Sequence, residues 1–284
     1  MKKLSVSLIV ISMLNLSACS SDDTAAPPTN NNIVQTEETA ETTETTCDNV
    51  NCESNNKTLV EQIFSDVINS NDTGPLDFLV HETILQDSID FYAALTANKP
   101  DQIATIKHIV ADGDYVAVHW HYSNTPENDF TESARVDLYK ITDNQIIERM
   151  NFSMQLSGNT ASGNSVFSNL YDYGTGLPNN DVAIEEENKI MVSDFYVEAF
   201  NNLNLEVIDE LVDENYIQHN PFVPNGRDGL RNFVASFSAS ANISIFLTLA
   251  EDDLVWTFRS DSPVVDLWRV DNNTNKIVEH WDVF

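Results

Sequence analysis

The sequence predicts an α+β fold in two tandem copies, and three observations lead to this prediction. The first is an internal repeat, because FLVHETILQDS (78–88) aligns without gaps with ELVDENYIQHN (210–220). The second is helical apolar spacing at the start of each copy. The third is a following series of short segments rich in β-branched and aromatic residues, separated by Asp, Asn and Ser. Helices followed by an antiparallel meander are typical of the α+β class.

The expected elements follow in the same order in both copies. In the first copy we expect a helix at 58–70 and strands near 103–110, 114–123, 132–142 and 145–155. In the second we expect helices at 185–202, 205–212 and 229–237, then strands near 243–250, 253–259, 263–271 and 276–283. The last two strands of each copy align as VDLYKITDNQIIERMNF (136–152) and VDLWRVDNNTNKIVEHWDV (265–283), with two extra residues in the second turn.

One stretch of the second copy carries a family resemblance. YIQHNPFVPNGRDGL (216–230), VDLWRV (265–270) and KIVEHWDVF (276–284) resemble the SnoaL-like branch of the nuclear transport factor 2-like superfamily. The first copy matches more weakly, through ADGDYVAVHWHY, VDLYKI and IIER. The resemblance implies two cone folds, each with helices packed on a curved antiparallel sheet that encloses an apolar pocket. Relatives often dimerise through their sheets, which implies an intramolecular pseudo-dimer or a homodimer.

The resemblance and the composition together divide the chain into five parts. They are a signal peptide at 1–19, an acidic disordered tether at 20–56, a first SnoaL-like domain at 57–170, a linker at 171–184 and a second domain at 185–284. The tether has no Lys or Arg before Lys57. Low hydrophobicity and charge of one sign cannot offset the entropy of ordering.

The N-terminus predicts the compartment. Residues 1–19 read MKKLSVSLIVISMLNLSAC, two lysines followed by an apolar run that fits a secretory signal. Their end resembles the bacterial lipobox, which implies cleavage before Cys19 and lipid on its sulfur. Because residue 20 is Ser rather than Asp, the expected location is the bacterial cell envelope at the outer membrane, with the lipid anchor as the sole membrane contact. The alternative is an ordinary signal peptide with an incidental cysteine.

The remaining cysteines, Cys47 and Cys52, lie four residues apart in the expected tether. In an oxidising compartment such a pair can close a small disulfide loop, and the alternative is two free thiols.

The charge of the chain limits the classes of partner. It has 45 acidic residues and 14 Lys and Arg, which gives a net charge of −31. That excludes nucleic acid as a probable class of partner, because a polyphosphate must meet a basic surface.

The second copy holds the candidate catalytic residues. His280 and Asp282 are two apart on an expected strand, so they face the same way, with Trp281 and Val283 on the other side. We expect His219 and Asn220 in a loop at the pocket mouth, and Trp256 and Phe258 as apolar lining. A carboxylate with a raised pKa beside imidazoles suits proton transfer next to a carbonyl. The alternative is that these residues only cap turns and pair with each other.

The first copy departs from this pattern. Asp87 and Ser88 align with His219 and Asn220, while Arg149 and Asn151 align with His280 and Asp282, so the same reaction is not expected there. His119 and His121 share one strand face. As candidate pocket-lining residues they predict either a ligand or metal site or a half-buried strand, and the second is preferred because a third ligand is not identifiable.

Three function classes stay open at this point. The first is an enzyme acting on a small carbonyl compound as lyase, isomerase or aldol-type cyclase. The second is a binding protein for a small apolar molecule, and the third is an interaction lipoprotein. No cofactor and no metal are expected, and no nucleotide loop, nucleophile elbow or HExxH motif occurs.

Overall fold

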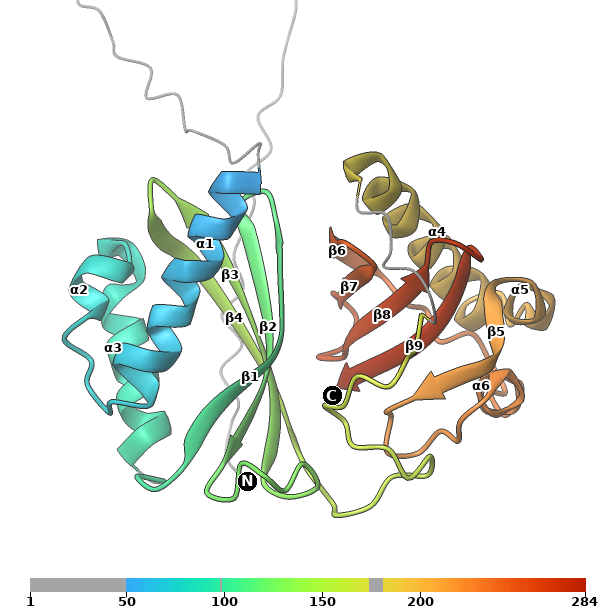
Figure 1. Ribbon diagram of the computed structural model, residues 1–284, viewed down its shortest axis with the longest axis horizontal. Helices are drawn as coiled ribbons and strands as arrows, with labels where there is room; N and C mark the ends of the chain where they lie inside the picture. Colours follow the sequence, from blue (N-terminus) through green and yellow to red (C-terminus); the bar gives the residue numbers. More distant parts are fainter. Residues whose placement is uncertain (1–49, 98, 174–180) are drawn as a thin grey trace, which may run out of the picture. The chain divides into compact units, whose positions relative to one another are not determined.

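The computed structural model describes residues 50–97, 99–173 and 181–284 (Figure 1). Among the helices in these ranges, none has both the length and the apolar character that crossing a bilayer demands. The predicted signal peptide, the lipobox cysteine Cys19 and most of the predicted tether lie outside the described residues.

The first half is a four-stranded antiparallel sheet with helices on one face (Figure 1). Its order is β1-β2-β3-β4, formed by β1 (Ile103–Asp112), β2 (Tyr115–Ser123), β3 (Ser133–Thr142) and β4 (Gln145–Gln155). The covering helices are α1 (Val50–Gln62), which continues as a π-helical turn at Ile63–Ile68, α2 (Leu76–Leu79) and α3 (Glu82–Ala97). Positive φ angles at Asp143 and Asn144 build the tight turn between β3 and β4.

The second half repeats this plan with one more strand. Its sheet has the order β5-β9-β8-β7-β6, formed by β5 (Val212–Gln218), β6 (Ile245–Glu251), β7 (Leu254–Arg259), β8 (Val265–Asp271) and β9 (Lys276–Val283). Helices α4 (Val182–Phe200), α5 (Leu205–Leu211) and α6 (Arg227–Ala235) accompany it. The side chains of Asp181 and Asn204 cap the first turns of α4 and α5 by accepting from backbone N–H groups.

The repeat is visible in the strand pairing. Val80 forms an isolated parallel bridge with Ile146, and Val212 pairs in parallel with Ile277 at the start of β5 and β9. The offsets between these pairs are those of the sequence alignment. The predicted α+β class, the eight predicted strands and their order are therefore confirmed.

The two sheets share one buried layer. Both halves fall in one compact unit, and a single cluster of buried side chains draws on both. It includes Val136 and Phe152 from the first sheet and Trp256, Phe258 and Trp281 from the second. Two residues of the connecting segment, Val166 and Phe167, belong to the same cluster.

Three local expectations differ from the structure. Helix α1 spans Val50–Gln62 rather than beginning at 58, and buried Asn56 donates to the carbonyl oxygen of Gly113, so residues 50–56 of the expected tether are helical. Helix α3 was not predicted, although it holds Asp87 and Ser88. The expected loop after α5 is strand β5, because its backbone pairs with β9.

Cys52 lies in α1 and is disulfide-bonded. Its predicted partner, Cys47, lies outside the described residues, so the pairing itself stays a prediction.

Candidate functional site

A cavity of about 350 Å³ lies in the second half, between its sheet and its helices. Apolar and aromatic side chains from α4, α6, the loop between α6 and β6, and the sheet form most of its wall, among them Phe200, Leu230, Phe233, Phe237, Ile243 and Trp268. Gly229 on α6 lies so close to the preceding loop that a Cβ atom there would approach the carbonyl oxygen of Pro224 to 2.4 Å. This position therefore needs glycine for α6 to close the cavity.

One end of the cavity is polar, and strand β9 supplies its centre. His280 and Asp282 line the cavity, while Trp281 and Val283 point into the layer between the sheets. The alternation expected from the sequence is therefore correct. Asn220 also lines the cavity, just after the end of β5.

The hydrogen bonds around His280 define one of its ring protons. Gln218 Oε1 accepts from the backbone N–H groups of His219 and Asn220, which identifies that atom as the amide oxygen. His280 Nδ1 lies 2.9 Å from the same oxygen, so Nδ1 carries a proton and donates it. On the other side, His280 Nε2 lies 3.1 Å from Asp266 Oδ1, and that contact holds one shared proton.

Asp266, on β8, is the centre of a second set of contacts. Tyr196 donates its hydroxyl proton to Asp266 Oδ2 at 2.8 Å, and Arg259 in turn donates to the Tyr196 oxygen at 3.2 Å. Asp266 and Arg259 both line the cavity. The polar end is thus a continuous chain of hydrogen bonds from Arg259 to Gln218.

Asp282 lies beside this chain. Its Oδ2 accepts from the Asn220 side-chain amide, and its Oδ1 is buried without a hydrogen-bond partner. Burial, reinforced by the charge of Asp266 and opposed by His280, raises the pKa of Asp282 to about 6. This carboxyl group therefore titrates close to neutral pH.

His219 does not reach the cavity, contrary to the sequence prediction. Its ring stacks on Trp281 with a centroid separation of 4.9 Å, in the layer between the sheets. Its Nε2 lies 2.8 Å from Glu279 Oε1, and its Nδ1 faces the carbonyl oxygen of Ser165. The reason is that residue 219 follows a strand rather than a loop, so successive side chains alternate and only Asn220 turns inward.

The expected lining residues Trp256 and Phe258 are also on the wrong face. Both are fully buried in the cluster between the sheets. The alternate residues of β7 face the helices, and Arg259 among them reaches the cavity. The pairing of Trp256 and Phe258 on one face was correct, but their polar neighbour Thr257 marked the inward side.

The comparison with known families supports the repeat. The sequence model of the SnoaL-like domain matches residues 56–149 and 192–280, together more than half of the chain. The chain belongs to the SnoaL-like domain family. The two matches fall one on each half, so the chain holds two tandem SnoaL-like domains. No curated protein matches the chain.

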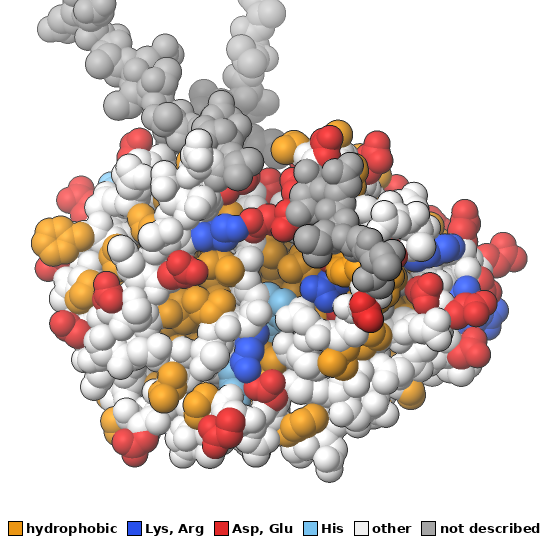
Figure 2. Space-filling model, in the orientation of Figure 1, with side chains coloured by type: hydrophobic (Ala, Val, Ile, Leu, Met, Phe, Trp, Pro, Cys, Tyr) orange, Lys and Arg blue, Asp and Glu red, His pale blue; other side chains and the backbone are white. Residues whose placement is uncertain are grey.

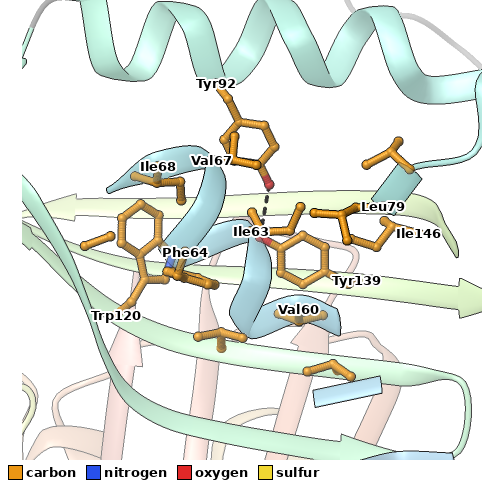
Figure 3. Close-up of a cluster of buried hydrophobic side chains, with 14 of the residues drawn as sticks. Val60, Ile63, Phe64, Val67, Ile68, Leu79, Tyr92, Trp120, Tyr139 and Ile146 are labelled. Atoms are coloured by element: carbon orange, nitrogen blue, oxygen red, sulfur yellow. Dashed lines mark hydrogen bonds between the residues drawn. The ribbon is translucent and has the colours of Figure 1, made fainter. Parts of the chain in front are cut away.

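The interior of the first SnoaL-like domain contains a cluster of buried hydrophobic side chains (Figure 3). Tyr92 from α3 and Tyr139 from β3 meet there, with their hydroxyl oxygens 3.1 Å apart. Asp137, the counterpart of Asp266, is fully buried and accepts from the Tyr139 hydroxyl. Arg149, in the position of His280, lies over the ring of Phe91 at 3.7 Å from its centroid. Asp87 is carried by helix α3, so the alignment of 87–88 with 219–220 does not extend to the structure.

His119 and His121 do not line a pocket, contrary to the prediction. Both are fully buried between the sheets, where His119 packs against Phe167 and Trp256 and His121 packs against Phe167. His119 Nδ1 lies 3.1 Å from His108 Nδ1, and His121 Nε2 lies 2.8 Å from the carbonyl oxygen of Thr131. The preferred interpretation, a strand that carries polar residues, agrees better with the structure, although both histidines are fully rather than half buried.

Sequence reasoning missed Asp266, Tyr196 and Gln218. A signal for Asp266 existed, because both copies carry VDL followed by an aromatic residue, which places an aspartate inside an apolar strand twice. A buried aspartate in such a strand needs partners. Tyr196 had no such signal, since its helix carries apolar residues at most buried positions.

Proposed function

We propose that the second SnoaL-like domain binds a small, largely apolar molecule that carries a carbonyl or hydroxyl oxygen. The observation that carries this proposal is the cavity itself, which joins an aromatic wall to one polar end at Asp266, His280 and Asp282. Its volume lies at the lower end of the range usual for small-ligand sites, about 300–1,000 Å³. Apolar walls favour a hydrophobic body, and the polar end fixes the orientation of one oxygen.

A second candidate function, proton transfer beside that carbonyl, is favoured by the state of Asp282. A carboxyl group whose pKa is raised to about 6 is matched to general acid–base work near neutral pH. In this function Asp282 accepts a proton from the carbon next to the carbonyl, and Asn220 holds the carboxyl group in place. The reaction class would be that of an isomerase, lyase or aldol-type cyclase.

Binding is tested first, by thermal unfolding of the full chain with a panel of mono- and polycyclic ketones, 2-acetylnaphthalene among them. A ligand should raise the unfolding temperature. Leu230→Trp, which fills the cavity from α6, should abolish that shift, and Arg149→Ala in the first domain should preserve it. The proposal is wrong if no panel member stabilises the chain, or if the shift survives Leu230→Trp.

Turnover is tested with the same compounds, by exchange of the hydrogens next to the carbonyl into heavy water. Asp282→Asn should slow exchange by about 10²–10⁴-fold, the usual size of a general-base effect. Arg149→Ala should change the rate far less. If exchange is undiminished in Asp282→Asn, the proton-transfer function is wrong and only the binding function remains.

We also propose that the chain is secreted and anchored through lipid on Cys19 to the bacterial cell envelope, at the outer membrane. The support is the sequence of residues 1–19. Within the chain, we propose that the two domains act as an intramolecular pseudo-dimer, which the shared buried layer supports. Sedimentation at the mass of a single chain would agree with this arrangement, and a stable mass of two chains would contradict it.

A further inference from the structure

Three side chains at the polar end of the cavity converge on one point. One possible ligand atom from each of Asp266, His280 and Asp282 lies within 4.8 Å of the others. All three side chains belong to residues that are more than nine-tenths buried, with exposed fractions of 3, 5 and 7%. Two carboxylates and one imidazole form a donor set that suits divalent transition metals such as zinc, iron or manganese.

A neighbouring side chain hydrogen-bonds each of the three residues and fixes its orientation. Each residue has a hydrogen-bond partner on one of its possible ligand atoms: Tyr196 on Asp266 Oδ2, Gln218 on His280 Nδ1 and Asn220 on Asp282 Oδ2. In metal sites, partners of this kind fix the tautomer of the histidine and the orientation of the carboxylates. The atoms without such a partner are His280 Nε2, Asp266 Oδ1 and Asp282 Oδ1, and we call these three the inner atoms.

The inner atoms are poorly satisfied by one another. His280 Nε2 and Asp266 Oδ1 contact each other at 3.1 Å, but Asp282 Oδ1 is buried with no hydrogen-bond partner. A buried carboxylate oxygen without a donor costs free energy. A hydrogen-bonded dyad explains the first two atoms and leaves the third unexplained.

The charge of the site is compatible with a bound cation. Release of the proton that His280 and Asp266 share would leave two carboxylates and a neutral imidazole inside a largely apolar cavity. Such charges persist when they are paired or coordinate a metal. A single divalent cation would neutralise both.

We propose that Asp266, His280 and Asp282 bind one divalent transition-metal ion, for which zinc is the probe, at the polar end of the second domain's cavity. Three protein ligands leave at least one coordination position open, as in catalytic zinc sites. An imidazole and only two carboxylates make calcium and magnesium poor occupants, since these ions prefer six or more oxygen ligands.

The ion also gives the cavity a role for the ligand oxygen. If the proposed function holds, a carbonyl or hydroxyl oxygen of the bound molecule takes the open coordination position. A bound metal would polarise that carbonyl as a Lewis acid. Asp282 would then be a metal ligand, so this site and the general-base role of Asp282 in the second candidate function exclude each other. The ion site itself stands on the three inner atoms and does not depend on the ligand.

The test is calorimetric titration of zinc chloride into the full chain after treatment with a chelator. The wild type should bind one ion at this site, and Asp282→Asn, which keeps the side-chain size, should weaken binding by more than about 100-fold. Gln218→Ala removes only the hydrogen-bond partner of His280 Nδ1 and should weaken binding by about 10–100-fold. His81→Gln, a histidine of the first domain, is the matched control and should bind as the wild type does.

Two results would overturn the inference. One is the absence of zinc binding to the folded wild type, and the other is equal affinity in wild type and Asp282→Asn. Circular dichroism checks that each variant is folded, and the visible spectrum of bound Co²⁺ provides a second readout if calorimetric heats are small.

The same samples separate this inference from the proposed function. If 2-acetylnaphthalene stabilises the chain and zinc does not bind, the metal site is wrong and the ligand cavity stands. If zinc binds and no ketone of the panel stabilises either the loaded or the stripped chain, the ligand proposal fails and the metal site stands.

Discussion

Acidification should destabilise the layer between the two sheets through His108, a residue of β1 that is 5% exposed. Its Nε2 lies 2.9 Å from Asn169 Oδ1, an atom that also accepts from Arg269 and is therefore the amide oxygen. His108 Nε2 thus carries a proton and donates. In the neutral ring, Nδ1 is an acceptor, and His119 Nδ1 supplies the proton at 3.1 Å. The bare His119 Nε2, which has no partner, fits this neutral arrangement.

The magnitude follows from the pKa. Burial, together with the charges of Arg269 and His219, lowers the pKa of His108 from 6.5 to about 4, although Asn169 and Glu279 oppose the change. The folded chain therefore binds fewer protons than the unfolded chain between pH 6.5 and 4. Stability is present above pH 6.5 and is lost as the pH falls through this window. At 1.36 kcal/mol per pKa unit, His108 alone accounts for about 3 kcal/mol.

Urea unfolding at pH 7 and at pH 4 measures this loss as a difference between variants. His108→Gln keeps a donor toward Asn169 but does not titrate. Between pH 7 and pH 4 its free energy of unfolding should therefore fall by about 3 kcal/mol less than that of the wild type. Comparison with the wild type cancels the carboxyl groups that also titrate. His81→Gln, which removes a histidine bonded to Thr83, is the control and should lose as much as the wild type. A constant difference between His108→Gln and the wild type at both pH values would refute the reasoning.

Further predictions concern the anchor, the disulfide and the packing. Cys19→Ala should leave unprocessed or unlipidated chain, and the intact mass of the mature protein checks this. Cys47 and Cys52 should resist alkylation until a reductant is added, and modification of both thiols without reductant would contradict the pairing. Trp281→Ala empties a fully buried position between the sheets, so the free energy of unfolding in urea should fall by about 3–5 kcal/mol. Gly229→Ala should displace α6 and weaken ketone binding, because a Cβ atom would meet the Pro224 carbonyl oxygen.

Strand positions followed from the sequence because each strand carries its own signal. The turns at Gly113, Asp143-Asn144 and Asn275 have positive φ, and the residue types that tolerate it marked the strand ends. Helix α3 was missed because QDS (86–88) aligns with QHN (218–220), and the first segment was expected to have the same non-helical conformation as the second. In the second copy the chain stays extended there and pairs with β9, whereas in the first it becomes helical after Val80. Tertiary pairing, not local propensity, decides between the two.

Which residues of a strand share a face was predictable from the sequence. Which of the two faces points toward the cavity was not always predictable. Asp282 and His280 were placed correctly because helices cover one side of β9 and polar residues on that side need a cavity. Trp256 and Phe258 were misplaced because a second sheet, rather than solvent, covers the outer side of β7. An antiparallel sheet that is apolar on both faces gives no alternation from which to read the inside.

Acidic side chains are spread over the visible surface, with few Lys or Arg among them (Figure 2). This distribution agrees with the net charge of −31 and with a solvated, repulsive surface. The candidate site carries its acidic groups inside the protein, so the overall charge and the chemistry of the cavity have separate origins.

The segment that leaves the first domain bears on whether the second domain can be used on its own. Its backbone carbonyl at Ser168 accepts a hydrogen bond from the indole N–H of Trp281. The backbone N–H groups of Leu170 and Tyr171 donate to the Glu279 carboxylate. Glu279 precedes the cavity residue His280 on β9. The strand that presents the cavity residues is therefore buttressed by chain that belongs to the other copy. A fragment of residues 181–284 would lack these hydrogen bonds, so we expect it to be less stable than the same domain within the full chain. Any design that transfers the cavity to another protein therefore has to include the connecting segment together with the second domain.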